Sequence, residues 1–326
     1  MNCRAMEELE KLVERKGKRF LFKVETSSFH QDYLKYEELR NEIWDFPQDN
    51  LPGSRNMMCE NFFKDGSSLF ISVYRESEGG GFSKQDKDHL VGFSYGFVGV
   101  KEKKIGFRSV DNIQFYSQYT GVREEFQNHG LGIPIKEFQR EKLMELFGIY
   151  TVTCTYDPLT GINAYRNIRY FGMEVVSYRV DIYGEFGGRL NREDIPSDRF
   201  VMSWDLRKNA RRPDCDVESL LEAGLVVTGI EYAEVQGKSG FVELEILREV
   251  NLSLSQQMLL VEIPLDFYRM LRETDVEQKR AREIPLEWRM KTREVFQTLF
   301  NTGYKVIDFR QVEKDGRKRN FYIIKK

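Results

Sequence analysis

Short apolar runs and stretches rich in β-formers recur along the first 122 residues, separated by polar or glycine-rich segments, as is typical of β-strands. These runs predict four strands, over residues 20–24, 67–75, 89–100 and 112–122. Apolar side chains recur at helical spacing over residues 31–44, which predicts a helix between the first two strands. The connections that follow the second and third strands are glycine-rich or charged, as hairpin turns tend to be.

A longer amphipathic helix is predicted over residues 131–147. Its apolar side chains share one broad face: Leu131, Ile135, Phe138, Leu143 and Leu146. Pro134 is tolerated because the amides of a first helical turn have no helical partner, and Gly148 ends the helix.

The next segments continue the alternation of strands and helices. A strand over residues 150–156 and a helix over residues 161–170 precede strands over residues 173–183 and 199–206. This alternation predicts an α/β (α+β) fold with a mixed sheet.

Polar residues 208–216 with Pro213 predict a linker, and 326 residues exceed one average domain. We therefore expect two units, residues 1–207 and residues 208–326. The second unit has predicted strands and one helix, over residues 225–235, 241–247, 258–263, 286–301 (the helix), 304–309 and 320–324. The order strand, helix, glycine, strand, strand occurs in both units, so a degenerate second copy of the fold is one hypothesis.

Composition limits the classes of partner. The chain is 40% hydrophobic and 31% charged, which is typical of a globular protein, and 50 basic residues nearly balance 52 acidic ones. This balance gives no reason to expect nucleic acid or a membrane as a partner. The four cysteines and three histidines are scattered, which indicates neither a disulfide framework nor a metal site. The N-terminus has no apolar leader, so we expect a cytoplasmic protein.

The most informative segment lies between a predicted strand and the long predicted helix, at residues 122–132. Unpaired amides and the positive end of the helix dipole favour an anion there, and glycines let phosphate oxygens approach closely. The glycines occur in the pattern Gln127-x-x-Gly130-x-Gly132. This combination is suited to a pyrophosphate.

This pattern resembles the Q/R-x-x-G-x-G/A motif of the GNAT superfamily, the general-control-related N-acetyltransferases. In that family the motif follows a strand with a valine and an aromatic residue, matched here by Val122 and Phe126, and it opens a long helix. The resemblance covers about residues 18–207. Short segments are similar to a poorly characterised branch of predicted acetyltransferases: Tyr156-Asp157-Pro158-Leu159, Asn163-Ala164, Leu190-Asn191, residues 196–199, residues 261–264 and Trp288-Arg289.

The resemblance implies a GNAT fold with a mixed, mainly antiparallel central sheet and acetyl-CoA or another acyl-CoA as co-substrate, without a metal. Backbone amides from Gln127 to Gly132 would hold the CoA pyrophosphate, and main chain near Val122 would pair with the pantetheine arm. The implied cofactor-binding residues are Val122, Gln127, Asn128, His129, Gly130, Leu131, Gly132 and Asn163. The imidazole of His129 is expected to be incidental, because any residue could supply its amide.

Amide formation needs a neutral amine, and the leaving thiolate needs a proton. Many relatives supply that proton from a tyrosine at the position that Ile168 occupies here. Tyr165 and Tyr170 on the same helix are substitutes, with Tyr156 and Asp157 at the end of the preceding strand. We take Tyr165 and Asp157 as the catalytic candidates, although Asp157 before a proline also suits the start of a turn.

The resulting hypothesis is an acyl-CoA-dependent N-acyltransferase, with N-acetyl transfer to a small-molecule amine or amino-acid-like acceptor. Two alternatives stay open: aminoacyl or long-chain acyl transfer from a carrier other than CoA, and a non-catalytic CoA-sensing or interaction module. The sequence determines neither the acceptor nor the oligomeric state. In the last predicted helix, Trp288 begins an apolar stripe, and Arg289, Lys291 and Arg293 are expected to form the solvated face.

Overall fold

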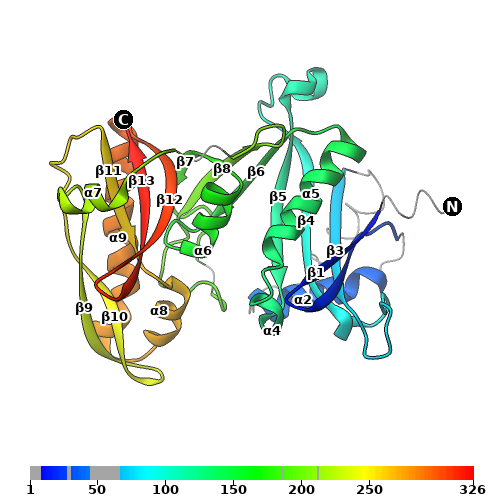
Figure 1. The fold of residues 1–326 in the computed structure, drawn as a ribbon, viewed down its shortest axis with the longest axis horizontal. Coiled ribbons are helices and arrows are strands. Elements are labelled where there is room, and N and C mark those ends of the chain that lie inside the picture. Colours follow the sequence, from blue (N-terminus) through cyan, green and yellow to red (C-terminus); the bar gives the residue numbers. More distant parts are fainter. Residues whose placement is uncertain (1–8, 28–30, 45–66, 186, 211–212) are drawn as a thin grey trace. The chain divides into compact units, whose positions relative to one another are not determined.

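A computed structural model describes residues 9–27, 31–44, 67–185, 187–210 and 213–326. The chain packs as two compact units (Figure 1). The N-terminal unit consists of Met1–Cys154 and Asp205–Arg207, and the C-terminal unit consists of Thr155–Trp204 and Lys208–Lys326. The division suggested by linker composition lies after residue 207. Packing instead joins Thr155–Trp204 to the C-terminal half, because buried ion pairs described below connect the two.

The N-terminal unit is built on a mixed, mainly antiparallel sheet. Its strands follow in the order β1-β2-β3-β4-β5-β6: β1 (Glu10–Arg15), β2 (Lys18–Val24), β3 (Ser68–Arg75), β4 (Leu90–Val100), β5 (Ile113–Val122) and the start of β6 (Thr151–Tyr156). Neighbours up to β5 are antiparallel, whereas β5 and β6 are parallel. This confirms the predicted fold class. Strand β1 lies in a segment where no strand was predicted.

Two helices cover opposite faces of this sheet. Helix α2 (Gln31–Trp44) packs Tyr36 against Phe70 of β3, in a core cluster that also contains Leu21. Helix α5 (Gly132–Lys142) packs Phe138 against Phe22. Leu21 and Phe22 are neighbours in β2, so their side chains point to opposite faces of the sheet. The sheet therefore lies between α2 and α5.

The predicted helix over residues 131–147 is confirmed with one change at its end. Its last turn, η4 (Leu143–Phe147), is a π-helix, and Gly148 ends it with a φ of 62° in the left-handed region. The wider π turn rotates its side chains relative to the α-helical face. Leu146, predicted on the apolar face, is consequently 45% exposed.

The C-terminal unit contains three sets of strands together with several helices. Its elements are α6 (Gly161–Ala164), the π-helix η5 (Tyr165–Tyr170), β7 (Glu174–Arg179), β8 (Arg199–Asp205), α7 (Val217–Glu222), β9 (Thr228–Gly237), β10 (Gly240–Val250), β11 (Met258–Ile263), α8 (Phe267–Glu273), α9 (Lys279–Asn301), β12 (Lys305–Lys314) and β13 (Arg317–Lys325). The three sets of strands are β8-β7 next to β6, β9-β10 and β11-β13-β12. The predicted strands and helices all occur. The sequence patterns did not predict α7 and α8, which are too short for a clear period.

The two strand–helix–strand–strand segments share one topology. Strands β6, β7 and β8 lie in the order β6-β8-β7, and strands β11, β12 and β13 lie in the order β11-β13-β12. In each segment a glycine with positive φ precedes the second strand in the sequence: Gly172 precedes β7 and Gly303 precedes β12. A degenerate second copy of the fold would produce this shared strand order, and the existence of such a copy stays a hypothesis. The connection from β10 to β11 contains no helix comparable to α5, so it offers no second loop of the same kind.

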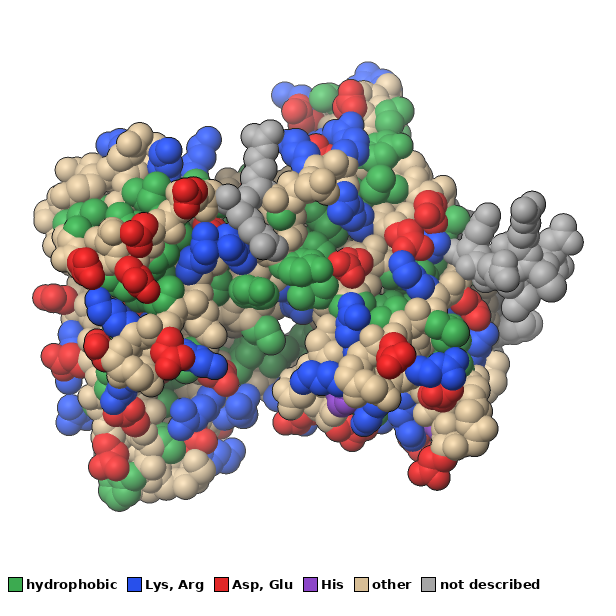
Figure 2. Space-filling model, viewed as in Figure 1, with side chains coloured by type: hydrophobic (Ala, Val, Ile, Leu, Met, Phe, Trp, Pro, Cys, Tyr) green, Lys and Arg blue, Asp and Glu red, His purple; other side chains and the backbone are tan. Residues whose placement is uncertain are grey.

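Charged side chains of both signs are interspersed over the face drawn in Figure 2. This distribution agrees with the near balance of charge in the sequence. No helix in the described part of the chain is long and apolar enough to span a membrane.

Candidate functional site

The loop between β5 and α5 places a tight turn directly before a helix. Strand β5 ends at Val122, the single-turn helix α4 (Glu124–Gln127) follows, and α5 begins at Gly132. Gly130 has a φ of 68°, and a Cβ built on it would meet no atom within 4 Å. This residue therefore combines a left-handed backbone with open space beside it.

Three amides at the start of α5 have no internal acceptor in the described structure. The first recorded bond of the helix runs from the Ile135 amide to the Leu131 carbonyl, at 3.0 Å. The amides of Leu131, Gly132 and Ile133 have no acceptor among the described residues, and Pro134 has no N–H. Unpaired amides at the positive end of a helix make an anion site.

The other predicted loop residues have internal partners. The amides of His129 and Gly130 donate to the carbonyls of Phe126 and Gln127, at 3.1 and 3.3 Å. The Gln127 side chain donates to the Val122 carbonyl at 3.1 Å and closes the loop. The geometry therefore concentrates the available donors at residues 131–133 rather than along the whole predicted stretch.

The ring of His129 packs into the protein instead of toward the open side of the loop. It lies against Phe20 and Phe126, with ring centroids 5.9 and 5.6 Å away. Asn128, in contrast, is exposed. The packing agrees with the expectation that the imidazole of His129 is incidental to anion binding.

The edge of β5 that leads to this loop is largely unpaired. Parallel pairing with β6 joins Phe115 to Val152 and Tyr116 to Thr153, and continues no further in the described structure. A bulge lies at this point, because Gly96 of β4 pairs with Ser117 while Tyr95 pairs with Tyr119. Bulges disrupt pairing and bend the strand. Between residue 117 and Val122, the backbone groups that face away from β4 are thus available to an extended ligand.

A buried polar network holds the bulge against α5. Lys136 donates to the Ser117 hydroxyl at 2.6 Å and to the Gln139 side chain at 3.3 Å. Gln139 donates to Ser94 at 2.8 Å, and the Ser94 hydroxyl lies 3.3 Å from that of Thr120. Sequence reasoning missed this network. The available signal was two polar residues, at positions 136 and 139, on the apolar face of the predicted helix.

Asn163 and Tyr165, also predicted as site residues, lie in the C-terminal unit. Asn163 on α6 donates to the Thr160 hydroxyl at 3.0 Å and accepts a hydrogen bond from Arg166. Tyr165 begins η5 and is 48% exposed. Ile168, at the position of the tyrosine in many relatives, is buried.

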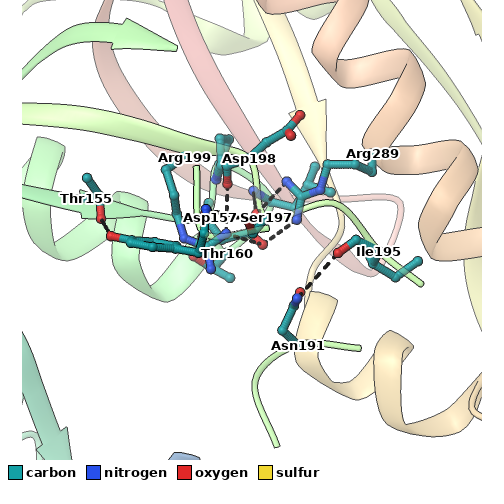
Figure 3. A network of polar contacts seen from close by, with 12 residues as sticks. Thr155, Asp157, Thr160, Asn191, Ile195, Ser197, Asp198, Arg199 and Arg289 are labelled. Atoms are coloured by element: carbon teal, nitrogen blue, oxygen red, sulfur yellow. Dashed lines mark hydrogen bonds and ion pairs between the residues drawn. The ribbon is translucent and has the colours of Figure 1, made fainter. Parts of the chain in front are cut away.

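Asp157, the second catalytic candidate, lies in a buried network (Figure 3). Arg289 donates to both carboxylate oxygens, Nη1 to Oδ1 at 2.9 Å and Nη2 to Oδ2. Arg199 lies 3.6 Å from Oδ2, and the Leu159 amide donates to Oδ1, which is the turn contact expected before Pro158. Burial alone would raise the pKa of Asp157, but the charges of Arg289 and Arg199 outweigh it and lower that pKa.

A second buried carboxylate, Asp198, extends this network. Arg293 donates to both of its oxygens at 2.8 Å, and the Tyr178 hydroxyl donates at 2.6 Å. Burial and the negative charge of Asp198 raise the pKa of Tyr178 well above its ordinary value. The expectation of a solvated face was wrong for Arg289 and Arg293, because buried aspartates draw both guanidinium groups inward. Lys291 is partly exposed and donates to the Leu247 carbonyl.

Several segments that carry the resemblance meet in this network, although they are far apart in the sequence. Asp157, Asp198 with Arg199, and Arg289 are in direct ionic or hydrogen-bonding contact (Figure 3). Asn191 lies in the loop that leads to Asp198, and its amide donates to the Ile195 carbonyl at 3.4 Å. These contacts connect distant segments of the chain inside the C-terminal unit.

Solved structures of similar fold include acetyltransferases. One, Arabidopsis thaliana NAA60 in complex with acetyl-CoA, has 12% identity, with 58% of this chain and 99% of that chain covered and a TM-score of 0.43. Another is the ribosomal-protein-S5-alanine acetyltransferase from Vibrio fischeri, with 10% identity, 62% and 100% covered and a TM-score of 0.41. A third is an acetyltransferase of the GNAT family from Streptococcus pneumoniae, with 10% identity, 58% of this chain and 99% of that chain covered, and a TM-score of 0.39.

The last of these three structures is described as a member of the GNAT family. The order β5, α5, β6 around the loop is the order expected from the Gln127-x-x-Gly130-x-Gly132 motif. No family model matches the sequence, and no curated protein matches it.

Proposed function

We propose that this protein is an acyl-CoA-dependent N-acyltransferase, with acetyl as the acyl group and a small-molecule amine or amino-acid-like acceptor. The observation that carries the proposal is the set of unpaired amides at Leu131, Gly132 and Ile133, beside the open space at Gly130. These donors suit the CoA pyrophosphate, because its negative charge is complementary to the positive end of the helix dipole.

The unpaired edge of β5 supports the same proposal. The pantetheine arm of CoA carries amide groups that can pair with a free strand edge, as a peptide does when it adds to a sheet. The edge runs from the bulge near Ser117 to Val122 and leads directly to the loop. Val122, Gln127, Asn128 and His129 would shape this path, and Asn163 is the proposed contact from α6.

The reaction is direct attack of a neutral amine on the thioester carbonyl. A C–N bond forms, the C–S bond breaks, the amine loses a proton and the CoA thiolate gains one. We propose the exposed Tyr165 hydroxyl as the donor to the thiolate. Asp157 is engaged by Arg289 on both oxygens, so we assign it a positioning role at the end of β6.

The Cys215 thiol forms no disulfide, which is compatible with a reducing compartment, and we propose a cytoplasmic location.

A matched pair of variants tests the cofactor site. Gly130→Asp and Gly130→Asn have nearly equal size, and both residues tolerate a left-handed φ, so the pair differs in charge alone. Calorimetric titration with CoA and acetyl-CoA should show at least about tenfold weaker binding to Gly130→Asp than to Gly130→Asn. Gly148→Asp, at the exposed glycine that ends the same helical segment, is the control and should bind like wild type.

The alternatives give different results in the same titration. Weak CoA binding by folded wild-type protein would favour transfer from another carrier. Tight CoA binding without turnover across a panel of amines and acyl chain lengths would favour a sensing or interaction module. Equal affinities of Gly130→Asp and Gly130→Asn would refute the pyrophosphate site.

A further inference from the structure

The connection between β4 and β5 protrudes from the N-terminal unit. In Figure 1 it extends as a blue-green segment beyond the ends of both strands. It contains two short 3-10 helices, η2 (Gly106–Arg108) and η3 (Val110–Asn112). Two apolar side chains on it are exposed, Phe107 to 69% and Val110 to 72%. Isolated exposed apolar residues are common on protein surfaces, so these two become informative only through their surroundings.

A buried asparagine holds the connection in one conformation. Asn112 is only 5% exposed. Its side-chain carbonyl accepts from the Glu102 amide at 2.9 Å, and its side-chain amide donates to the carbonyls of Glu102 and Gly106, at 2.9 and 2.8 Å. The two apolar side chains are therefore presented on an ordered backbone. Little backbone entropy would be lost if a partner covered them.

The same connection carries a local excess of positive charge. Residues 101–111 contain four basic residues and only two acidic ones. The basic residues are Lys101, Lys103, Lys104 and Arg108. The first and the last of these donate to backbone carbonyls, which leaves their charge in place. The other two are exposed and form no ion pair within the residues that the structure describes.

A second exposed phenylalanine lies in surroundings of the opposite charge. Phe241 on β10 is 71% exposed. The hairpin of β9 and β10, residues 228–250, contains five glutamates against one lysine and one arginine. Phe107 and Phe241 thus have nearly equal exposure, but only the surroundings of Phe107 would be attracted to an anionic surface.

We propose that the connection between β4 and β5 docks on an anionic lipid surface. Phe107 and Val110 would enter the interfacial layer, and the four basic side chains would contact the headgroups. Lysine and arginine are attracted to anionic lipids, and apolar side chains gain free energy when they leave water. The near balance of charge over the whole chain does not oppose this, because salt screens charges that lie more than about 10 Å away at 0.1 M.

The size and shape of the connection favour lipid over other anionic partners. A specific protein interface buries about 800 Å² on each partner, which two side chains on a protruding connection cannot supply. A lipid layer, in contrast, takes up an inserted side chain without a complementary pocket. Nucleic acid would use the basic side chains but would leave Val110 in water. The proposal does not depend on the proposed acyltransferase activity.

Co-sedimentation of the full chain with lipid vesicles at low salt tests the proposal. We expect binding to vesicles of equimolar phosphatidylcholine and phosphatidylserine, little binding to pure phosphatidylcholine, and loss of binding as salt is added. Phe107→Ser should weaken the binding at least about tenfold, because the apolar insertion is lost. The double variant Lys103→Gln with Lys104→Gln should weaken it by a similar factor. All replaced side chains are exposed, so thermal transitions should match wild type.

The controls make the same replacements elsewhere on the surface. Phe241→Ser, and Lys314→Gln with Lys318→Gln on the β12–β13 hairpin, should bind vesicles like wild type. The proposal is overturned if wild type binds anionic and neutral vesicles equally or binds neither, or if Phe107→Ser and Phe241→Ser bind equally well. Binding of single-stranded RNA through Lys103 and Lys104, without vesicle binding, would overturn it in favour of nucleic acid. No outcome bears on the CoA site, because no measurement involves CoA.

Discussion

Arg289 and Asp157 form a bidentate ion pair inside the C-terminal unit, although 132 residues separate them in the sequence. Arg289 is fully buried and Asp157 nearly so. A single buried charge is costly, whereas a paired and hydrogen-bonded one is tolerated. The pair therefore makes the segment after β6 depend on helix α9 for its charge balance.

Removal of one partner of this pair should strongly destabilise the protein. We expect Asp157→Asn to lower the free energy of unfolding by about 3–5 kcal/mol, because Arg289 keeps its buried charge without a counterion. The double variant Asp157→Asn with Arg289→Met should lose less than the sum of the single variants. Urea unfolding curves at pH 7 measure both effects.

Asp194→Asn is the control, since Asp194 pairs with Arg192 and Arg282 at an exposed position. Its effect should stay below about 1 kcal/mol. Equal losses for Asp157→Asn and Asp194→Asn would contradict the importance of the buried pair.

Acid should reduce the contribution of Asp157. Its folded-state pKa is lowered from the ordinary 3.8, so the unfolded chain takes up a proton first as the pH falls. The stabilisation is present above pH 3.8 and is lost as the pH falls from there through the folded-state pKa. The difference in unfolding free energy between wild type and Asp157→Asn should therefore narrow below about pH 4. A constant difference between pH 7 and pH 3 would argue against this linkage.

Truncation after residue 207 should not yield a stable domain. The fragment would keep Asp157 and Asp198 but lose Arg289 and Arg293, their bidentate partners. We expect no cooperative thermal transition and an aggregation-prone fragment, compared with the full chain by circular dichroism and gel filtration. A monomeric, cooperatively melting fragment would show that residues 1–207 fold independently.

Replacement of the proposed proton donor should reduce turnover without loss of folding. Tyr165→Phe removes an exposed hydroxyl, so its thermal transition should match wild type. With an accepted amine, kcat should fall about 100-fold or more, while the affinity for acyl-CoA stays the same. Tyr170→Phe on the same π-helix is the control. Wild-type kcat in Tyr165→Phe would remove this residue from the mechanism.

The order of strands and helices followed from sequence because it depends on local patterns. The β-rich composition of β3, β4 and β5, and the apolar face of α5, predicted these elements within a few residues. Gly148 and Gly172 marked the ends of helical segments, since both take a left-handed backbone. Short helices such as α7 and α8 were not predicted, because fewer than eight residues contain too few turns to show a helical period of apolar positions.

The loop before α5 was also accessible from sequence, since glycine spacing and a following helix specify an anion site locally. Tertiary structure decided which donors remain, because the turn itself uses the amides of His129 and Gly130. Tertiary structure likewise decided the roles of Arg289 and Arg293. A helical pattern places a residue on a face, but only packing against Asp157 and Asp198 determines that Arg289 is buried and that Arg293 is largely shielded from solvent. The composition of residues 208–216 marked a linker, while the buried charges determined which segments pack together.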